Sequence, residues 1–233
     1  MISHKHKCIF VHIPKAAGTS IERAFMDDLN LDMDNRHSLL LGASTNKSLG
    51  PRRVSHLLAK EYVEHHYISQ ELFDDYFKFA FVRNPFTRLY STYKFLKFSD
   101  YLDFDTFIQK KLISLLKSKE FGFFLAPQTN YIYTNKYCEV DFVGKFENLK
   151  NDFQVIKEEL NLSNLVLKHY NKTIQTTNFL NKFKILFKSI RDSSSLSDIN
   201  YRNSEYKLDS TSKDIIYSIY ERDFDNFDYN KDF

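Results

Sequence analysis

Short apolar runs alternate with amphipathic segments along the chain. Three runs are too short for helices and are rich in β-branched and aromatic side chains, so they predict buried strands; they span residues 8–11, 77–83 and 140–146. Each run is followed, directly or after a loop, by apolar residues three or four positions apart, which is the period of a helix. This alternation predicts a three-layer α/β/α domain with a mainly parallel central sheet.

The remaining pattern predicts further elements. Asn84 and Pro85 are typical of an N-cap and a first helical residue. We interpret residues 30–51, which are mostly polar, as a long surface excursion, and we expect a short strand at 52–56. The other predicted helices span residues 57–67, 70–76, 104–116, 149–160 and 178–190. Thr211 and Asp214 resemble a capping box for a last helix.

The chain length sets the domain organisation that we expect. A chain of 233 residues suits one domain with a full core. We therefore predict a single domain over residues 1–233. The segment 178–211 is assigned to no part of its core and is interpreted as an insertion or mobile segment.

The stretch after the first strand has the composition of an anion-binding loop. It reads H-I-P-K-A-A-G-T-S from His12 to Ser20. Small side chains let backbone N–H groups converge on a phosphate, and the following helix adds its partial positive charge. Lys15 supplies a formal charge. In a nucleoside-triphosphate loop the Lys follows the last Gly, whereas here it precedes Gly18, so that motif is not met. A plain turn between strand and helix stays open for this stretch alone.

A second candidate corner follows the next strand. Arg83 ends that strand and Ser91 lies eight residues further on. Ligands of open parallel sheets bind outside the carboxyl ends of the strands, so Arg83 is expected at that edge. A guanidinium suits a phosphate dianion, and a hydroxyl adds a neutral hydrogen-bond donor. A P-loop NTPase needs an Asp at the end of a neighbouring strand to hold Mg²⁺, whereas this strand ends in Arg, which repels a metal.

Together these stretches resemble a known family. H-I-P-K-A-A-G-T-S and F-V-R-N-P-F-T-R-L-Y-S-T-Y, the latter from Phe81 to Tyr93, resemble the two phosphate motifs of sulfotransferases. The likeness is to the carbohydrate-modifying and bacterial branch, which uses 3′-phosphoadenosine 5′-phosphosulfate (PAPS). V-G-K-F-E-N-L (143–149) and Y-E-R-D-F-D-N-F-D-Y (220–229) resemble the family's late strand–helix junction and C-terminal signature. In the loop 168–173 the chain departs from the pattern, with Lys168 where the family usually has Pro.

The resemblance implies a PAPS-dependent O-sulfotransferase without a metal, on the P-loop-like fold of that family. It implies direct in-line transfer to a hydroxyl of a carbohydrate or glycolipid. Arg83 and Ser91 would bind the 3′-phosphate, and Lys15 would stabilise charge on the leaving oxygen. Arg88 also matches the pattern of the 3′-phosphate motif, and a helix-surface or salt-bridge role stays open for it. The residues implied for the 5′-phosphosulfate are Lys15, Ala16, Ala17, Gly18, Thr19 and Ser20.

The acceptor hydroxyl needs a base, and His56 is the best candidate. The resemblance implies this role, because S-H-L-L-A from Ser55 falls where related enzymes place a His between the two phosphate motifs. An imidazole titrates near neutrality, and a positioned base contributes about 10²–10⁴-fold. We interpret His12 as ordering the loop. The other competing histidines are His37, His65, His66 and His169.

The charge and cysteine content of the chain indicate which partners and which cellular compartment to expect. The formal net charge is +3 and no block of five like charges occurs, which argues against a nucleic-acid partner. The two cysteines, Cys8 and Cys138, form no disulfide framework or zinc spacing, so a reducing, cytoplasmic setting is expected. No apolar run is long enough for a signal peptide or a transmembrane segment.

Two other function classes stay open at this point. One is a nucleotide or small-molecule kinase, which requires Mg²⁺ and ATP. The other is a non-catalytic nucleotide- or glycan-binding protein on the same fold. The acceptor and the oligomeric state are not specified by the sequence, because acceptor pockets are built from variable loops.

Overall fold

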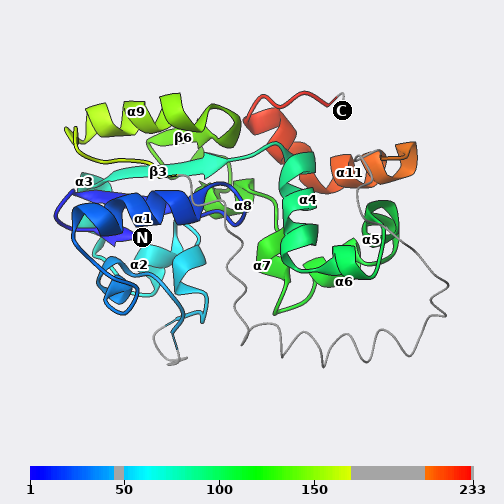
Figure 1. Ribbon diagram of the computed structural model, residues 1–233, viewed down its shortest axis with the longest axis horizontal. Coiled ribbons are helices and arrows are strands. Elements are labelled where there is room, and N and C mark those ends of the chain that lie inside the picture. The colour runs from blue at the N-terminus through cyan, green and yellow to red at the C-terminus, as the bar shows by residue number, and fades with distance from the viewer. Residues whose placement is uncertain (45–49, 169–207, 232–233) are drawn as a thin grey trace.

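The computed structural model of the chain describes residues 1–44, 50–168 and 208–231 (Figure 1). Its central sheet has the order β1-β2-β3-β6. The strands are β1 (Ile2–Ser3), β2 (Cys8–Val11), β3 (Phe77–Val82) and β6 (Phe142–Lys145). β2, β3 and β6 run parallel, and β1 pairs antiparallel with β2. The mainly parallel sheet and its three predicted strands are confirmed. β1 was not predicted, because two residues carry no periodic signal.

Both faces of the sheet are buried, as expected for parallel strands. Phe10 and Phe79 face α1 (Gly18–Asp28) and α9 (Leu149–Glu159), and their rings stack 5.1 Å apart. Ile9, Val11 and Ala80 alternate with them and face the opposite layer. That layer is made of α2 (Glu61–Glu64), α3 (Gln70–Asp75) and α8 (Thr129–Ile132). The predicted three-layer α/β/α arrangement is confirmed.

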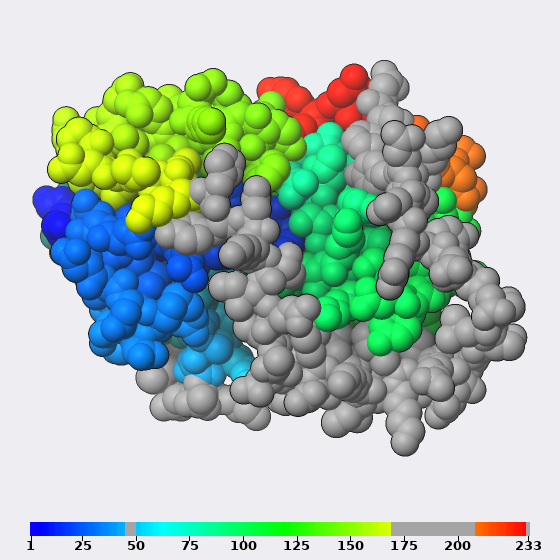
Figure 2. Space-filling view, viewed as in Figure 1, coloured from blue at the N-terminus to red at the C-terminus, as the bar shows by residue number. Residues whose placement is uncertain are grey.

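A second group of helices packs beyond the carboxyl ends of the strands (Figure 1). We call it the helical cluster. Its members are α4 (Pro85–Phe95), α5 (Phe104–Lys110), α6 (Leu112–Leu116), α7 (Gly122–Leu125) and α11 (Ser210–Asn226). Aromatic contacts hold it together, such as Phe86 and Phe224 with ring centroids 5.2 Å apart. In the space-filling view the sheet layers (blue, yellow-green) and the cluster (green, orange) occupy opposite sides (Figure 2).

Short elements connect these parts. A hairpin of β4 (Tyr133–Thr134) and β5 (Tyr137–Cys138) follows α8. The 3₁₀ helices are η1 (Arg36–Leu39), η3 (Val54–His56), η4 (Phe98–Asp100) and η5 (Phe146–Asn148). The predicted excursion at 30–51 holds η1, and its Leu39 and Leu41 are buried against the core, whereas residues 32–35 and 37–38 are exposed.

Several predicted boundaries are wrong. The expected strand at 52–56 is the 3₁₀ helix η3, and the expected helix at 57–67 shrinks to α2, because the Ala59 N–H donates to Tyr131 O instead of to a helical carbonyl. The helix at 104–116 breaks at Lys111, which leaves helical geometry with φ −121°. The last helix begins earlier than Thr211, because the Asp209 carboxylate accepts from the Ser212 N–H and caps Ser210 onward.

Some predictions cannot be compared with the structure. The predicted helix at 178–190, His169 and all but the last four residues of the segment 178–211 lie outside the described residues. Within residues 1–44, 50–168 and 208–231, no helix is both long enough and apolar enough to cross a membrane.

Candidate active site

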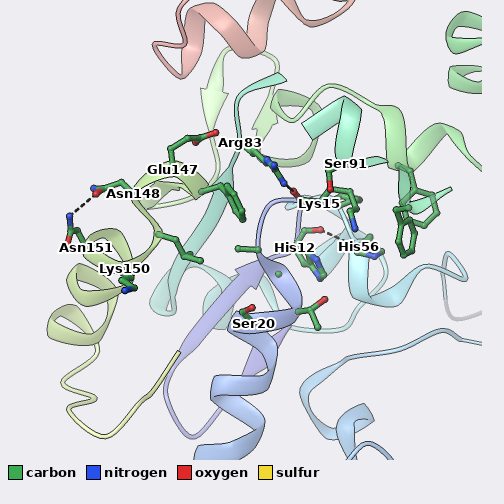
Figure 3. Close-up of a pocket in the computed structure, with 18 residues that line it drawn as sticks. His12, Lys15, Ser20, His56, Arg83, Ser91, Glu147, Asn148, Lys150 and Asn151 are labelled. Carbon is green, nitrogen blue, oxygen red and sulfur yellow. Dashed lines mark hydrogen bonds between the residues drawn. The ribbon is translucent and has the colours of Figure 1, made fainter. Parts of the chain in front are cut away.

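A pocket of about 750 Å³ lies where the carboxyl ends of β2, β3 and β6 meet their helices (Figure 3). This volume is typical of sites for small molecules and cofactors. Three strand–helix corners contribute to it. The first is the loop between β2 and α1, the second is Arg83 after β3 together with Ser91 and Phe95 of α4, and the third is the stretch from η5 into α9.

The first corner is shaped to bind an anion. Lys15 and Ala17 adopt left-handed backbone conformations with φ 68° and 73°. Such conformations cost about 1–3 kcal/mol each in non-glycine residues and cluster at functional sites. They turn successive N–H groups inward, as in the backbone concavities that bind phosphate. Ala17 at the N-cap has no polar side chain to cap α1. The Ser20 N–H donates to the Ala17 carbonyl at 2.9 Å, so the N–H groups of Gly18 and Thr19 are the first-turn donors that a ligand can use.

The structure places five of the six predicted 5′-phosphosulfate residues on the pocket wall: Lys15, Ala17, Gly18, Thr19 and Ser20. The exception is Ala16, whose side chain is 1% exposed and packs into the core beneath the sheet. Ala16 therefore has only its backbone to offer to a ligand.

Lys15 is held in an apolar setting. Its Nζ lies 4.2 Å from the centroid of the Phe95 ring, a cation–π contact. Burial, and then the neighbouring positive charge of Arg83, lower the pKa of Lys15 to about 8. A bound anion would favour the charged form and raise that pKa.

Arg83 joins the second corner to the first. Its Nε donates to Thr87 Oγ1 at 3.0 Å, and its NH1 to the Lys15 carbonyl at 3.5 Å. The guanidinium carbon lies 4.2 Å from the centroid of the Phe146 ring. Ser91, further along α4, lines the same pocket. The two predicted cations and the Ser91 hydroxyl therefore face one cavity.

The third corner was not assigned to the site from the sequence. It contributes Phe146, Glu147, Asn148, Leu149, Lys150 and Asn151. Glu147 accepts from the Asn84 N–H at 2.9 Å and from the Tyr229 hydroxyl at 2.9 Å. The signal for this corner was available, because a third parallel strand followed by a helix must end at the same sheet edge.

His56 is held with one ring nitrogen fixed. Its Nδ1 lies 3.1 Å from the His12 carbonyl oxygen. A carbonyl only accepts, so Nδ1 carries the proton and Nε2 keeps a lone pair. Burial, and then the nearby His12, hold the pKa of His56 well below its usual 6.5. The ring also packs 5.6 Å from the Phe123 ring. Because its pKa is lowered, the imidazole is neutral at pH 7.

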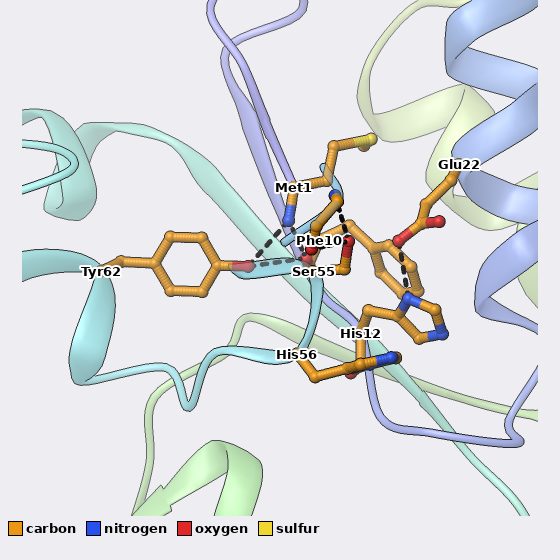
Figure 4. Close-up of polar contacts among 8 residues, drawn as sticks. Met1, Phe10, His12, Glu22, Ser55, His56 and Tyr62 are labelled. Atoms are coloured by element: carbon orange, nitrogen blue, oxygen red, sulfur yellow. Dashed lines mark hydrogen bonds and ion pairs between the residues drawn. The ribbon is translucent and has the colours of Figure 1, made fainter. Parts of the chain in front are cut away.

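His12 is also part of the pocket wall, and its contact with Glu22 is drawn in Figure 4. Its Nδ1 lies 2.6 Å from Glu22 Oε1, one turn into α1. Its Nε2 faces Gly18 so closely that a Cβ on Gly18 would lie 1.9 Å away. The His12 ring therefore holds the Lys15 loop against the first turn of α1. Glu22 was not predicted from the sequence.

The other candidates lie elsewhere. His37 is exposed and hydrogen-bonds the Asp34 carbonyl, and His65 and His66 follow α2 away from this pocket. The helix-surface interpretation of Arg88 is wrong. Arg88 is 1% exposed and donates to the Phe124 and Ala126 carbonyls.

A second cavity of about 600 Å³ reaches His56 from another direction. Its wall includes Arg52, Lys119 and Phe123. Of the residues with a described side chain, His56 is the one that lines both cavities. In the described ranges, no group of three or more His, Cys, Asp and Glu side chains could hold a metal ion.

Comparison with known proteins identifies relatives of the chain. The profile of the Sulfotransferase family matches residues 1–230. An uncharacterised protein of Archaeoglobus fulgidus is 31% identical over 98 residues, which cover 41% of this chain and 76% of that protein. No solved structure matches the chain.

Proposed function

The chain belongs to the sulfotransferase family, and from this premise we propose that it moves a sulfuryl group from PAPS to a hydroxyl of a carbohydrate or glycolipid. As a family member it is a PAPS-dependent sulfotransferase; the acceptor and the residue roles are the proposed part. The observation that carries the proposal is the single pocket that joins the Lys15 loop to Arg83, with His56 on its wall.

The pocket residues fit the sulfuryl donor, which carries phosphates on both the 3′ and 5′ positions of one adenosine. The backbone concavity at Lys15 and Ala17 and the first turn of α1 would hold the 5′-phosphosulfate. Arg83 and Ser91 would hold the 3′-phosphate, because a guanidinium pairs well with a phosphate dianion. When bound, PAPS supplies an activated sulfuryl group.

His56 is the proposed base. Its Nδ1–H is committed to the His12 carbonyl, so the Nε2 lone pair accepts the proton of the acceptor hydroxyl as the oxygen bonds to sulfur. The second cavity supports this role, because it gives an acceptor its own approach to His56. Phe123 in its wall offers an apolar face to a sugar ring.

Lys15 is proposed to stabilise the leaving group of the transfer. Negative charge grows on the bridging oxygen as the bond to sulfur breaks, and an ammonium already in place stabilises it. The contact with Phe95 holds the ammonium at the pocket wall. We propose no metal for this chemistry, because positive side chains stand at the anion corners.

Binding and transfer experiments separate this proposal from its alternatives. Calorimetry should detect adenosine 3′,5′-bisphosphate (PAP) with higher affinity than ATP with Mg²⁺; the opposite order would favour a kinase. Transfer of labelled sulfate from PAPS to a panel of glycans should then occur and survive a metal chelator. PAP binding with no transfer to any acceptor would favour a non-catalytic binding protein.

The role of His56 has its own test. Replacing it in His56→Gln should lower turnover by about 10²–10⁴-fold and leave PAP affinity within about twofold, because the imidazole acts on the acceptor side. His66→Gln is a matched control, since His66 lies outside the pocket wall, and it should keep full turnover. Full turnover in His56→Gln would contradict the assignment.

Two further expectations belong to this proposal. We propose a cytoplasmic enzyme because both cysteines, Cys8 and Cys138, are free thiols, and disulfides are rare in that compartment. We also propose that residues 1–233 act as one sulfotransferase domain.

A further inference from the structure

We infer that Gln128 and Asp223 are positioning residues for Arg83, and that they set how strongly the protein recognises a 3′-phosphate. This inference rests on the proposed role of Arg83. Neither residue touches the pocket, and both act through hydrogen bonds to backbone groups of other residues.

Arg83 stands just beyond the sheet. β3 ends at Val82, which pairs with Lys145 of β6, and β2 ends at Val11 opposite Ala80. The backbone N–H and carbonyl of Arg83 thus have no strand beside them. Backbone groups at such a point must find other partners or lose their hydrogen bonds.

The side chain of Gln128 supplies both partners. Its Oε1 accepts from the Arg83 N–H at 2.8 Å, and its Nε2 donates to the Arg83 carbonyl at 2.8 Å. The amide therefore pairs with Arg83 as a residue of a neighbouring strand would. Gln128 is fully buried, so water does not compete for these bonds. Fixing the backbone on both sides of the Arg83 Cα fixes the direction in which the guanidinium leaves it.

Asp223 in turn fixes Gln128. One carboxylate oxygen accepts from the Gln128 N–H at 2.8 Å, and the other accepts from the Thr129 N–H at 2.8 Å. Asp223 is fully buried on α11 and caps α8 from a distant part of the chain. Hydrogen bonds to an ionised group are about twice as strong as neutral ones, so this cap is a firm anchor.

The neighbouring backbone is anchored by the same helices. The Tyr220 hydroxyl of α11 donates to the Leu125 carbonyl at 2.7 Å, and the Arg88 guanidinium of α4 donates to the Ala126 carbonyl at 2.6 Å. The segment that carries Gln128 is therefore built as a rigid support. It lies between the helical cluster and the Arg83 corner.

The test compares two ligands that differ only in the 3′-phosphate. PAP carries it and adenosine 5′-monophosphate (AMP) does not, so the ratio of their affinities measures 3′-phosphate recognition alone. In Gln128→Leu we expect this ratio to fall about tenfold or more, with AMP affinity unchanged. Gln128→Glu keeps the volume and the bond to the Arg83 N–H. Its ionised carboxylate has no proton for the Arg83 carbonyl, so at a pH where the new carboxyl is ionised a smaller fall is expected. Asp223→Asn should also lower the ratio.

Controls separate positioning from general damage. Asp103 caps α5 by accepting from the Thr106 N–H, and it is no part of the chain of hydrogen bonds that runs from Asp223 through Gln128 to Arg83. Asp103→Asn should therefore leave the ratio of PAP to AMP affinity unchanged. Adding Arg83→Ala to Gln128→Leu should lower the ratio no further than Arg83→Ala alone, because both changes remove one interaction. If Gln128→Leu does not fold, Gln128→Glu carries the test.

Two results would overturn the inference. One is an unchanged PAP-to-AMP ratio in folded Gln128→Leu or Gln128→Glu protein. The other is an equal loss of both ligands, which indicates a merely structural role. Failure of the proposed function looks different: Arg83→Ala itself would then leave the ratio unchanged.

Discussion

Gly18→Ala should destabilise this protein, although the same exchange in most helices is favourable. Gly18 is the first residue of α1 and its φ is not in the left-handed region, so Ala could adopt the backbone conformation. Replacing Gly by Ala at such a position commonly stabilises by about 0.4–1 kcal/mol. Here the added Cβ would lie 1.9, 2.0 and 2.4 Å from three atoms of the His12 ring.

The size of the effect follows from what His12 must give up. The ring would have to turn away and break its 2.6 Å hydrogen bond to Glu22, and hydrogen bonds to charged groups contribute about 1.5–3 kcal/mol. It would also leave its stacked position on Phe10, at 5.6 Å. We expect a net loss of about 2 kcal/mol, which lowers the Tm of a chain of this size by about 4–8 °C.

Thermal unfolding with and without PAP measures this effect. His12→Ala provides the background in which the clash is absent, so adding Gly18→Ala there should cost nothing further. A Gly18→Ala protein as stable as the wild type would refute the reasoning, as would an equal loss in the His12→Ala background. Either result would mean that His12 does not lie over Gly18.

Two predictions concern the charge of Lys15. Lys15→Ala should lower turnover by about 10²-fold or more while PAP affinity falls much less. The reason is that PAP has no bond to sulfur, so it develops no charge on a leaving oxygen for the ammonium to stabilise. Equal losses in kinetic and binding assays would contradict this role. Because the pKa of free Lys15 is lowered to about 8 and a bound anion favours the charged form, PAP affinity should fall as the pH rises through 8. Lys15→Met should abolish that pH dependence in calorimetry, whereas Lys150→Met, which changes another lysine of the pocket wall, should retain it.

The sequence was most informative where local chemistry and strand order agree. Lys15 and Arg83 could be assigned to one edge because each follows a predicted strand, and parallel strands end at the same edge. The same rule applied to β6 would have added Glu147 and Asn148. V-G-K-F-E-N-L marks this strand–helix junction, but the pattern by itself does not assign its polar residues to the site.

Other parts could not be predicted, for physical reasons. Gln128 precedes α8, a helix of four residues, which is too short to carry a periodic signal. Its partner Asp223 is 95 positions away, and a cap supplied from such a distance leaves no trace in local sequence. η3 was mistaken for a strand because three residues fit either period, and the fixed ring of His56 depends on a carbonyl 44 positions earlier.

The C-terminal helix and the residues after it converge on one corner of the pocket. Asp223 reaches the backbone of Arg83 through Gln128, and the Tyr229 hydroxyl reaches the Asn84 N–H through Glu147. Two neighbouring residues at the β3–α4 junction are therefore each held by a separate two-step chain. The Lys15 loop is held by a different contact, the hydrogen bond between His12 and Glu22. Glu22 lies in the second turn of α1. The contact between His12 and Glu22 is thus made within the N-terminal segment, whereas the two chains that hold Arg83 and Asn84 depend on packing of the C-terminal residues against the sheet.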